Sequence, residues 1–142
     1  MARPSKEVLE ERQNFMQVVT ECAKDPSLFS EVFLDHKLFP YNKKYVNCQD
    51  RFIVYRSGRQ VGKTMSTAVK TIHFAFFAPL LLKTIKHECI ILIAAPTQNQ
   101  ASIMFGRIRD LIMKNEFLRG YVVRDTQTEI SMNFLDGSGK TT

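Results

Sequence analysis

Residues 56–64 have the residue types and spacing of a site that binds phosphate groups. The segment reads Arg-Ser-Gly-Arg-Gln-Val-Gly-Lys-Thr, and a phosphate-binding loop follows the pattern G-x-x-x-x-G-K-[ST]. Gly62, Lys63 and Thr64 fit this pattern, whereas Ser57 takes the place of the first glycine. The sequence therefore predicts a nucleotide-binding loop that departs from the pattern at one position.

The chemistry of a nucleoside triphosphate explains these residue types. Successive backbone N–H groups of such a loop point at phosphate oxygens, and Gly62 lets the backbone approach them closely. A helix that follows the loop adds the positive end of its dipole. Lys63 is expected to reach the β- and γ-phosphates, and the Thr64 hydroxyl to bind Mg²⁺. The predicted cofactors are ATP and Mg²⁺.

The elements that position this loop are predicted from the hydrophobic pattern. Residues 51–56 are rich in β-branched and aromatic side chains, which predicts a strand. Apolar residues recur at helical spacing from Thr64 to Phe77, and Pro79 is expected to follow the end of that helix. A strand before the loop and a helix after it form the context that this motif requires.

Helical periodicity also marks the first part of the chain. It predicts one helix over residues 5–24 and a short one over residues 28–34, separated by Asp25-Pro26, because a residue before proline avoids the α region. Residues 39–42 are expected to form a loop. We assign residues 1–50 to an N-terminal helical region.

A second strand and helix are predicted after residue 88. The continuous apolar run over residues 89–95 is typical of a strand buried on both faces. Thr97 predicts the cap of a helix whose apolar face spans residues 101–112, with Gln100 completing a capping box. Residues 128–134 alternate like a strand, and Asp136-Gly137 indicates a turn. This order predicts an α/β fold with a parallel sheet flanked by helices over residues 51–142.

The net charge of +6 is unevenly distributed along the 142 residues. Residues 1–50 carry 7 basic and 8 acidic side chains, and residues 51–142 carry 13 and 6. The basic excess has two equally supported interpretations: a polyanionic binding partner, or an ordinary basic surface in contact with solvent. The same two interpretations apply to a basic group that could face DNA phosphates: Arg107, Arg109, Lys114, Arg119 and Arg124.

Several other classes of protein are disfavoured. The first 20 residues hold charges and no apolar core of a signal peptide. The longest apolar run, residues 74–82, is too short to cross a bilayer, which predicts a soluble, intracellular protein. Three scattered cysteines describe neither a disulfide framework nor a zinc site, and a reducing compartment is expected.

The loop resembles the ATPase P-loop of viral and phage terminase large subunits, the motors that package DNA. An arginine commonly lies inside the loop of that family, as Arg59 does here. Residues 95–101 resemble the element after the family's second strand, and residues 134–138 resemble a hairpin that often holds Asn-Gly-Ser. Pro40-Tyr41-Asn42 stands where the family has an adenine-contacting motif ending in glutamine, from which Asn42 departs.

The resemblance implies the N-terminal ATPase domain of a packaging motor, with a RecA-like P-loop NTPase fold. It implies that Lys63 and Arg59 are catalytic, with Arg59 acting on γ-phosphate charge within its own subunit. A solvent-facing Arg59 paired with a carboxylate is the alternative. The residues that would hold ATP are Ser57, Gly58, Arg59, Gln60, Val61, Gly62, Lys63 and Thr64. The implied partners are double-stranded DNA, the portal, a small terminase subunit and sister subunits in a ring, in host cytoplasm and transiently at the procapsid.

An ATPase also needs carboxylates for Mg²⁺ and for the attacking water, and no Asp-Glu pair follows Lys63. The closest segment, residues 130–136, alternates in polarity. We expect a fragment of a longer ATPase domain, incomplete at its C-terminus, with unpaired apolar faces, marginal stability and weak turnover. A helicase-like ATPase and a non-catalytic nucleotide-binding remnant remain alternatives. A second Gly-Lys-Thr, residues 139–141, lacks the first glycine and is interpreted as a turn.

Overall fold

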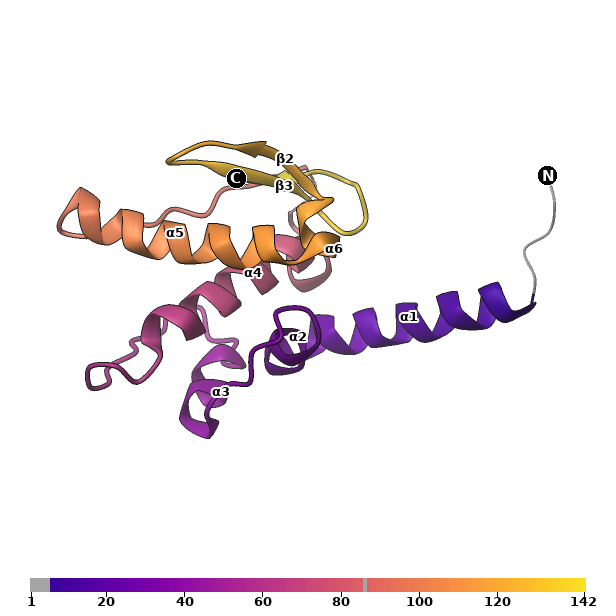
Figure 1. The fold of residues 1–142 in the computed structure, drawn as a ribbon, viewed down its shortest axis with the longest axis horizontal. Helices are drawn as coiled ribbons and strands as arrows, with labels where there is room; N and C mark the ends of the chain where they lie inside the picture. Colours follow the sequence, from indigo (N-terminus) through magenta and orange to yellow (C-terminus); the bar gives the residue numbers. More distant parts are fainter. Residues whose placement is uncertain (1–5, 86) are drawn as a thin grey trace.

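The computed structural model describes residues 6–85 and 87–142. In this part of the chain, six helices lie on one side of the hairpin formed by β2 and β3 (Figure 1). The helices are α1 (Lys6–Lys24), α2 (Pro26–Val32), α3 (Pro40–Val46), α4 (Lys63–Leu81), α5 (Gln98–Lys114) and α6 (Glu116–Arg119). The strands are β1 (Glu88–Cys89), β2 (Val122–Asp125), β3 (Ile130–Asn133) and β4 (Lys140–Thr141).

Asp25 and Pro40 mark where the second and third helices begin. The predicted first helix is confirmed over the described residues, with Ser5 outside them, and the break before Pro26 is confirmed as well. The Asp25 carboxylate accepts hydrogen bonds from the backbone N–H groups of Ser27 and Leu28, which starts α2. The predicted loop over residues 39–42 is wrong. Pro40 begins α3, at a position where a missing N–H costs nothing.

Helix α4 extends beyond its predicted end because it includes Pro79 in its last turn. Proline has no N–H to donate to the carbonyl four residues earlier, which belongs to Ala75. Thr141 Oγ1 of β4 donates to that carbonyl at 2.8 Å instead. The prediction that Pro79 follows the helix is wrong, and the proline frees a carbonyl that ties α4 to the sheet.

The sheet is mixed, in the order β1-β4-β3-β2. Strand β4 pairs parallel to β1, whereas β3 pairs antiparallel to both β2 and β4. The predicted strand at 128–134 and the Asp136-Gly137 turn are confirmed, and Gly137 adopts a φ of 69° there. The hairpins around β3 thus give antiparallel pairs where an all-parallel sheet was expected.

Two segments predicted to be strands form little or no strand in the structure. Residues 51–56 have no strand partner among the described residues, and Val54 is 87% exposed. In the run 89–95, ladder pairing ends near Ile91, and Leu92 is 85% exposed, so burial on both faces is wrong. Both segments line one groove of about 1100 Å³. The predicted strand at 51–56 is wrong and that at 89–95 is confirmed only at Cys89, because residue type cannot supply a partner strand.

The core is built on the buried face of α4. Fully buried side chains of α2, α5 and α6 pack against this face. Helix α5 begins as predicted at Thr97, whose side chain accepts a hydrogen bond from the backbone N–H of Gln100. The main core residues are Phe29, Ile72, Phe76, Phe77, Ile108, Ile112, Leu118 and Met132. Phe76 meets Phe77, Phe117 and Tyr121 edge to face, with ring centroids 5.0–5.9 Å apart.

Removal of the Phe76 ring tests whether this core holds the protein together. Phe76 is fully buried, so Phe76→Ala is expected to lower the free energy of unfolding by about 3–5 kcal/mol. Leu92, which is 85% exposed, is the surface control, and Leu92→Ala is expected to change stability by less than about 0.5 kcal/mol. Urea denaturation measures both, and equal losses would contradict the described core.

Stability is also expected to depend on pH through His73. This residue is 3% exposed, and its Nε2 lies 2.9 Å from the Cys22 carbonyl oxygen. Burial lowers the pKa of His73 from 6.5 to about 4, so the unfolded chain binds a proton at a higher pH than the folded chain. Between pH 7 and pH 4 the free energy of unfolding should therefore fall, by about 3 kcal/mol at most from this group.

The contribution of His73 is isolated by comparison with His73→Gln, which keeps a polar side chain for the Cys22 carbonyl. Denaturation curves at several pH values in this window are expected to show a smaller loss in the variant. The same pH dependence in both proteins would show that another group is responsible.

Candidate functional site

The loop 57–62 joins residues 51–56 to the first turn of α4, at the end of this helix far from α6 (Figure 1). Gln60 has a φ of 59° and Gly62 a φ of 81°, so two residues in the loop are left-handed. Gly62 is the N-cap and provides no side-chain hydrogen bond to the helix. The first turn of this 19-residue helix contains no acidic residue, so the positive end of its dipole is not neutralised locally.

The side chain of Lys63 folds back over the loop. Its Nζ donates a hydrogen bond to the Ser57 carbonyl oxygen at 2.6 Å. The Ser57 hydroxyl oxygen is buried and has no hydrogen-bond partner among the described residues. The structure therefore brings together the two ends of the predicted motif, Ser57 and Lys63, although the serine replaces a glycine.

The other predicted site residues differ in accessibility. Gly58, Arg59, Gln60 and Thr64 are exposed, whereas Val61 is half-buried. Thr64 lies on the first turn of α4 beside Lys63, where its hydroxyl is open to solvent. Arg59 makes no ion pair within the described part of the chain.

Behind the loop, contacts that the sequence did not predict hold it in place. Asn42 of α3 is 2% exposed, and its Nδ2 donates to the Val61 carbonyl oxygen at 3.1 Å. The Tyr55 hydroxyl donates to Asn42 Oδ1. The Tyr55 ring stacks on Tyr45, with centroids 4.2 Å apart and planes 10° from parallel. No spacing signal could have found these contacts, because they join α3 to segments 13 and 19 residues away.

The second Gly-Lys-Thr lies in a different environment. Gly139 ends the turn before β4, and a Cβ there would lie 1.9 Å from the His87 carbonyl oxygen. Lys140 and Thr141 form β4 itself, and the Thr141 side chain is committed to α4. The Asp136 carboxylate accepts from the N–H and hydroxyl of Ser138, which lowers its pKa. This tripeptide has a structural role in the sheet.

Some of the five basic side chains that could face DNA phosphates form ion pairs with carboxylates of the same chain. Arg109 donates two hydrogen bonds to the Asp125 carboxylate, at 2.6 and 2.7 Å, and Arg124 pairs with Glu129 at 3.1 Å. Arg107, Lys114 and Arg119 are exposed. Two of the five candidate DNA contacts are therefore occupied by carboxylates.

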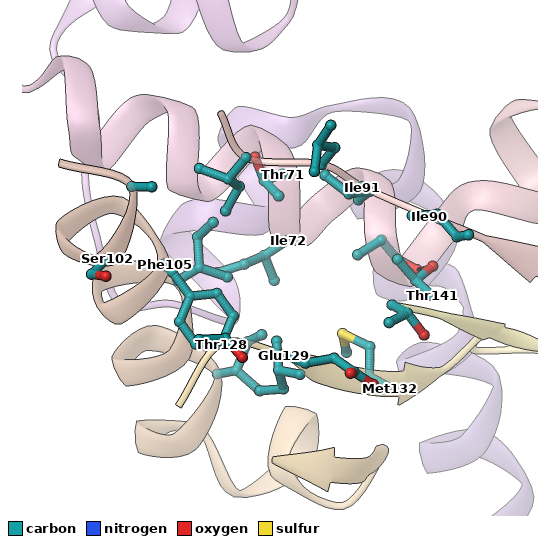
Figure 2. Close-up of a pocket in the computed structure, with 18 of the residues that line it drawn as sticks. Thr71, Ile72, Ile90, Ile91, Ser102, Phe105, Thr128, Glu129, Met132 and Thr141 are labelled. Atoms are coloured by element: carbon teal, nitrogen blue, oxygen red, sulfur yellow. Dashed lines mark hydrogen bonds between the residues drawn. The ribbon is translucent and has the colours of Figure 1, made fainter. Parts of the chain in front are cut away.

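A separate cavity of about 260 Å³ lies between α4, α5, residues 90–93 and β3 (Figure 2). Ile72, Ile91, Phe105 and Met132 point into it, and Thr71, Thr128 and Thr141 add hydroxyl groups (Figure 2). None of the residues 57–64 lines it. The phosphate-loop candidate and this mainly apolar cavity are distinct features of the structure.

Comparison with known proteins gives no further assignment. No protein family, curated protein or solved structure was found to match the chain. Among the described residues, no helix is both long enough and apolar enough to cross a membrane.

The left-handed backbone at Gly62 is expected to be essential to the loop. A Cβ at Gly62 would lie 2.9 Å from Asn42 Nδ2, and a left-handed conformation costs other residues about 1–2 kcal/mol. Gly62→Ala is therefore expected to lower the free energy of unfolding by at least this amount. Gly58→Ala is the control, because its Cβ would meet only Val61 at 4.0 Å. Thermal unfolding measures both, and equal effects would contradict the described loop geometry.

Proposed function

We propose that the chain binds ATP with Mg²⁺ at the loop 57–64. The observation that supports this most directly is the left-handed Gly62 at the uncapped start of α4, followed by Lys63 and Thr64. The backbone N–H groups of this turn, together with the helix dipole, suit a phosphate anion. A Cβ would fill the space at Gly62, and the unpartnered Ser57 hydroxyl lies in the same loop. The residues present therefore fit a bound triphosphate.

Each side chain of the loop has a defined part in this proposal. The Lys63 ammonium exchanges the neutral Ser57 carbonyl for phosphate oxygens, which are charged and form stronger hydrogen bonds. The exposed Thr64 hydroxyl is a ligand for Mg²⁺, and the exposed Arg59 stabilises charge on the γ-phosphate. A bound Mg²⁺ would neutralise part of the negative charge on the phosphates.

In line with the resemblance to terminase large subunits, we propose that this binding belongs to a DNA-packaging ATPase motor. Double-stranded DNA, the portal, the small subunit and sister subunits are the proposed partners, and the exposed Arg107, Lys114 and Arg119 are available to DNA phosphates. A nucleotide-binding module without turnover is a second candidate. Engagement of the Asp136 carboxylate by Ser138 favours it, because Asp136 ends the closest candidate acidic segment.

The lysine of the second Gly-Lys-Thr provides a control for a nucleotide-binding test. Lys63→Ala is expected to reduce the affinity for a fluorescent ATP analogue with Mg²⁺ at least tenfold, because it removes a charge-assisted contact of about 1.5–3 kcal/mol. Lys140→Ala removes the lysine of the second Gly-Lys-Thr and should leave affinity unchanged. Titration of the three proteins gives the result. Absence of binding by the unmodified chain, or equal losses in both variants, would overturn the proposal.

A further inference from the structure

We propose that Asn42 is a positioning residue that orients the backbone donors of the phosphate-binding loop and does not contact the nucleotide base. The consequence for nucleotide binding rests on the function proposed above. The consequence for loop geometry stands independently, on the contacts of Asn42 with Val61, Gly62 and Tyr55.

The first step of the argument is the planarity of the peptide bond. In a trans peptide the carbonyl of one residue and the N–H of the next point in opposite directions. Asn42 Nδ2 holds the Val61 carbonyl on the buried side of the loop. The Gly62 N–H is therefore directed to the opposite side, and no backbone acceptor for it is found in the described part of the chain.

The next peptide unit is held as well. Both the N–H and the Oγ of Ser66 donate to the Gly62 carbonyl, at 2.9 and 2.8 Å. By the same planarity, the Lys63 N–H points away from the helix toward the loop. Two consecutive donors, at Gly62 and Lys63, are thus aimed by Asn42 on one side and Ser66 on the other, which is the arrangement that binds an anion.

Asn42 can do this because its own side chain is fixed at both ends. The Tyr55 hydroxyl donates to Oδ1, which leaves Nδ2 as the group that faces Val61. Tyr55 stacks on Tyr45, whose hydroxyl lies 3.2 Å from Thr67 Oγ1 in α4. The amide is therefore held in one orientation by a chain of contacts that returns to the same helix as the loop.

The end of α3 is also attached to α4. Lys70 Nζ donates to the Val46 carbonyl at 2.9 Å, where a cation offsets the negative end of the α3 dipole. Asn42 is 2% exposed, and its amide contacts Val61 and Tyr55, so its remaining N–H and oxygen lone pair are not accessible to a purine edge. Loss of Asn42 should therefore weaken the binding of any nucleoside triphosphate equally.

The experiment compares the unmodified chain with Asn42→Ala and with the matched variant Asn115→Ala. Asn115 also donates to a backbone carbonyl, that of Phe33, and accepts from a backbone N–H, that of Leu118, but it lies at the α5–α6 junction. Backbone ¹⁵N order parameters without nucleotide are measured first. Those of Gly62 and Lys63 are expected to fall from near 0.85 to below about 0.6 in Asn42→Ala only.

Affinities for ATP and GTP with Mg²⁺ are measured next. Asn42→Ala is expected to lower both by about tenfold, the cost of one lost buried hydrogen bond, whereas Asn115→Ala leaves both unchanged. Unchanged order parameters at Gly62 would overturn the inference, and so would a loss confined to ATP, which would show that Asn42 reads the base. If Asn42→Ala does not fold, the order parameters are measured in Tyr55→Phe, which removes the hydroxyl that donates to Asn42 Oδ1. Greater mobility at Gly62 in this variant supports the inference, and unchanged mobility overturns it.

The two proposals fail in distinguishable ways. If the unmodified chain binds no nucleotide while only Asn42→Ala increases the mobility of Gly62, the proposed function is wrong and Asn42 still positions the loop. If Lys63→Ala abolishes binding while Asn42→Ala matches Asn115→Ala in mobility and affinity, the function stands and the positioning role is wrong.

Discussion

Burial of α4 is the constraint on which the rest of the described structure depends. This helix contacts α1, α2, α3 and α5 as well as strands β3 and β4, and its buried face runs from Ser66 to Ala78. Close packing on several sides prevents the helix from sliding or rotating freely. Its first turn is therefore held at a fixed place relative to α3, and the loop before Lys63 is shaped between two rigid elements.

Local sequence patterns predicted the helices better than the sheet, for a physical reason. A helix closes its hydrogen bonds within one segment, so periodicity and caps such as Asp25 and Thr97 are sufficient signals. A strand needs a partner that its own residues do not specify, and residues 51–56 form no strand in the described part of the chain. The loop predicted over residues 39–42 is replaced by the start of α3, because proline also suits the first helical position.

The candidate site was predictable where its chemistry is consecutive in sequence. Gly62, Lys63 and Thr64 could be identified from spacing, and the structure places them at the start of a long helix. Asn42 and Tyr55 could not be identified in this way, because their roles arise from tertiary contacts. The family resemblance aligned residues 40–42 with an adenine-contacting motif from which Asn42 departs, and the Asn42 side chain is turned to the Val61 carbonyl.

The two Gly-Lys-Thr tripeptides show why a motif needs its surroundings to bind an anion. At Gly62 the glycine is left-handed and a helix follows, so successive N–H groups are left without acceptors in that helix. At Gly139 the same three residues enter a strand, where the Lys140 N–H donates to the His87 carbonyl and Thr141 is 4% exposed. Identical side chains thus lie in opposite surroundings, because secondary structure decides whether the backbone donors are free or paired.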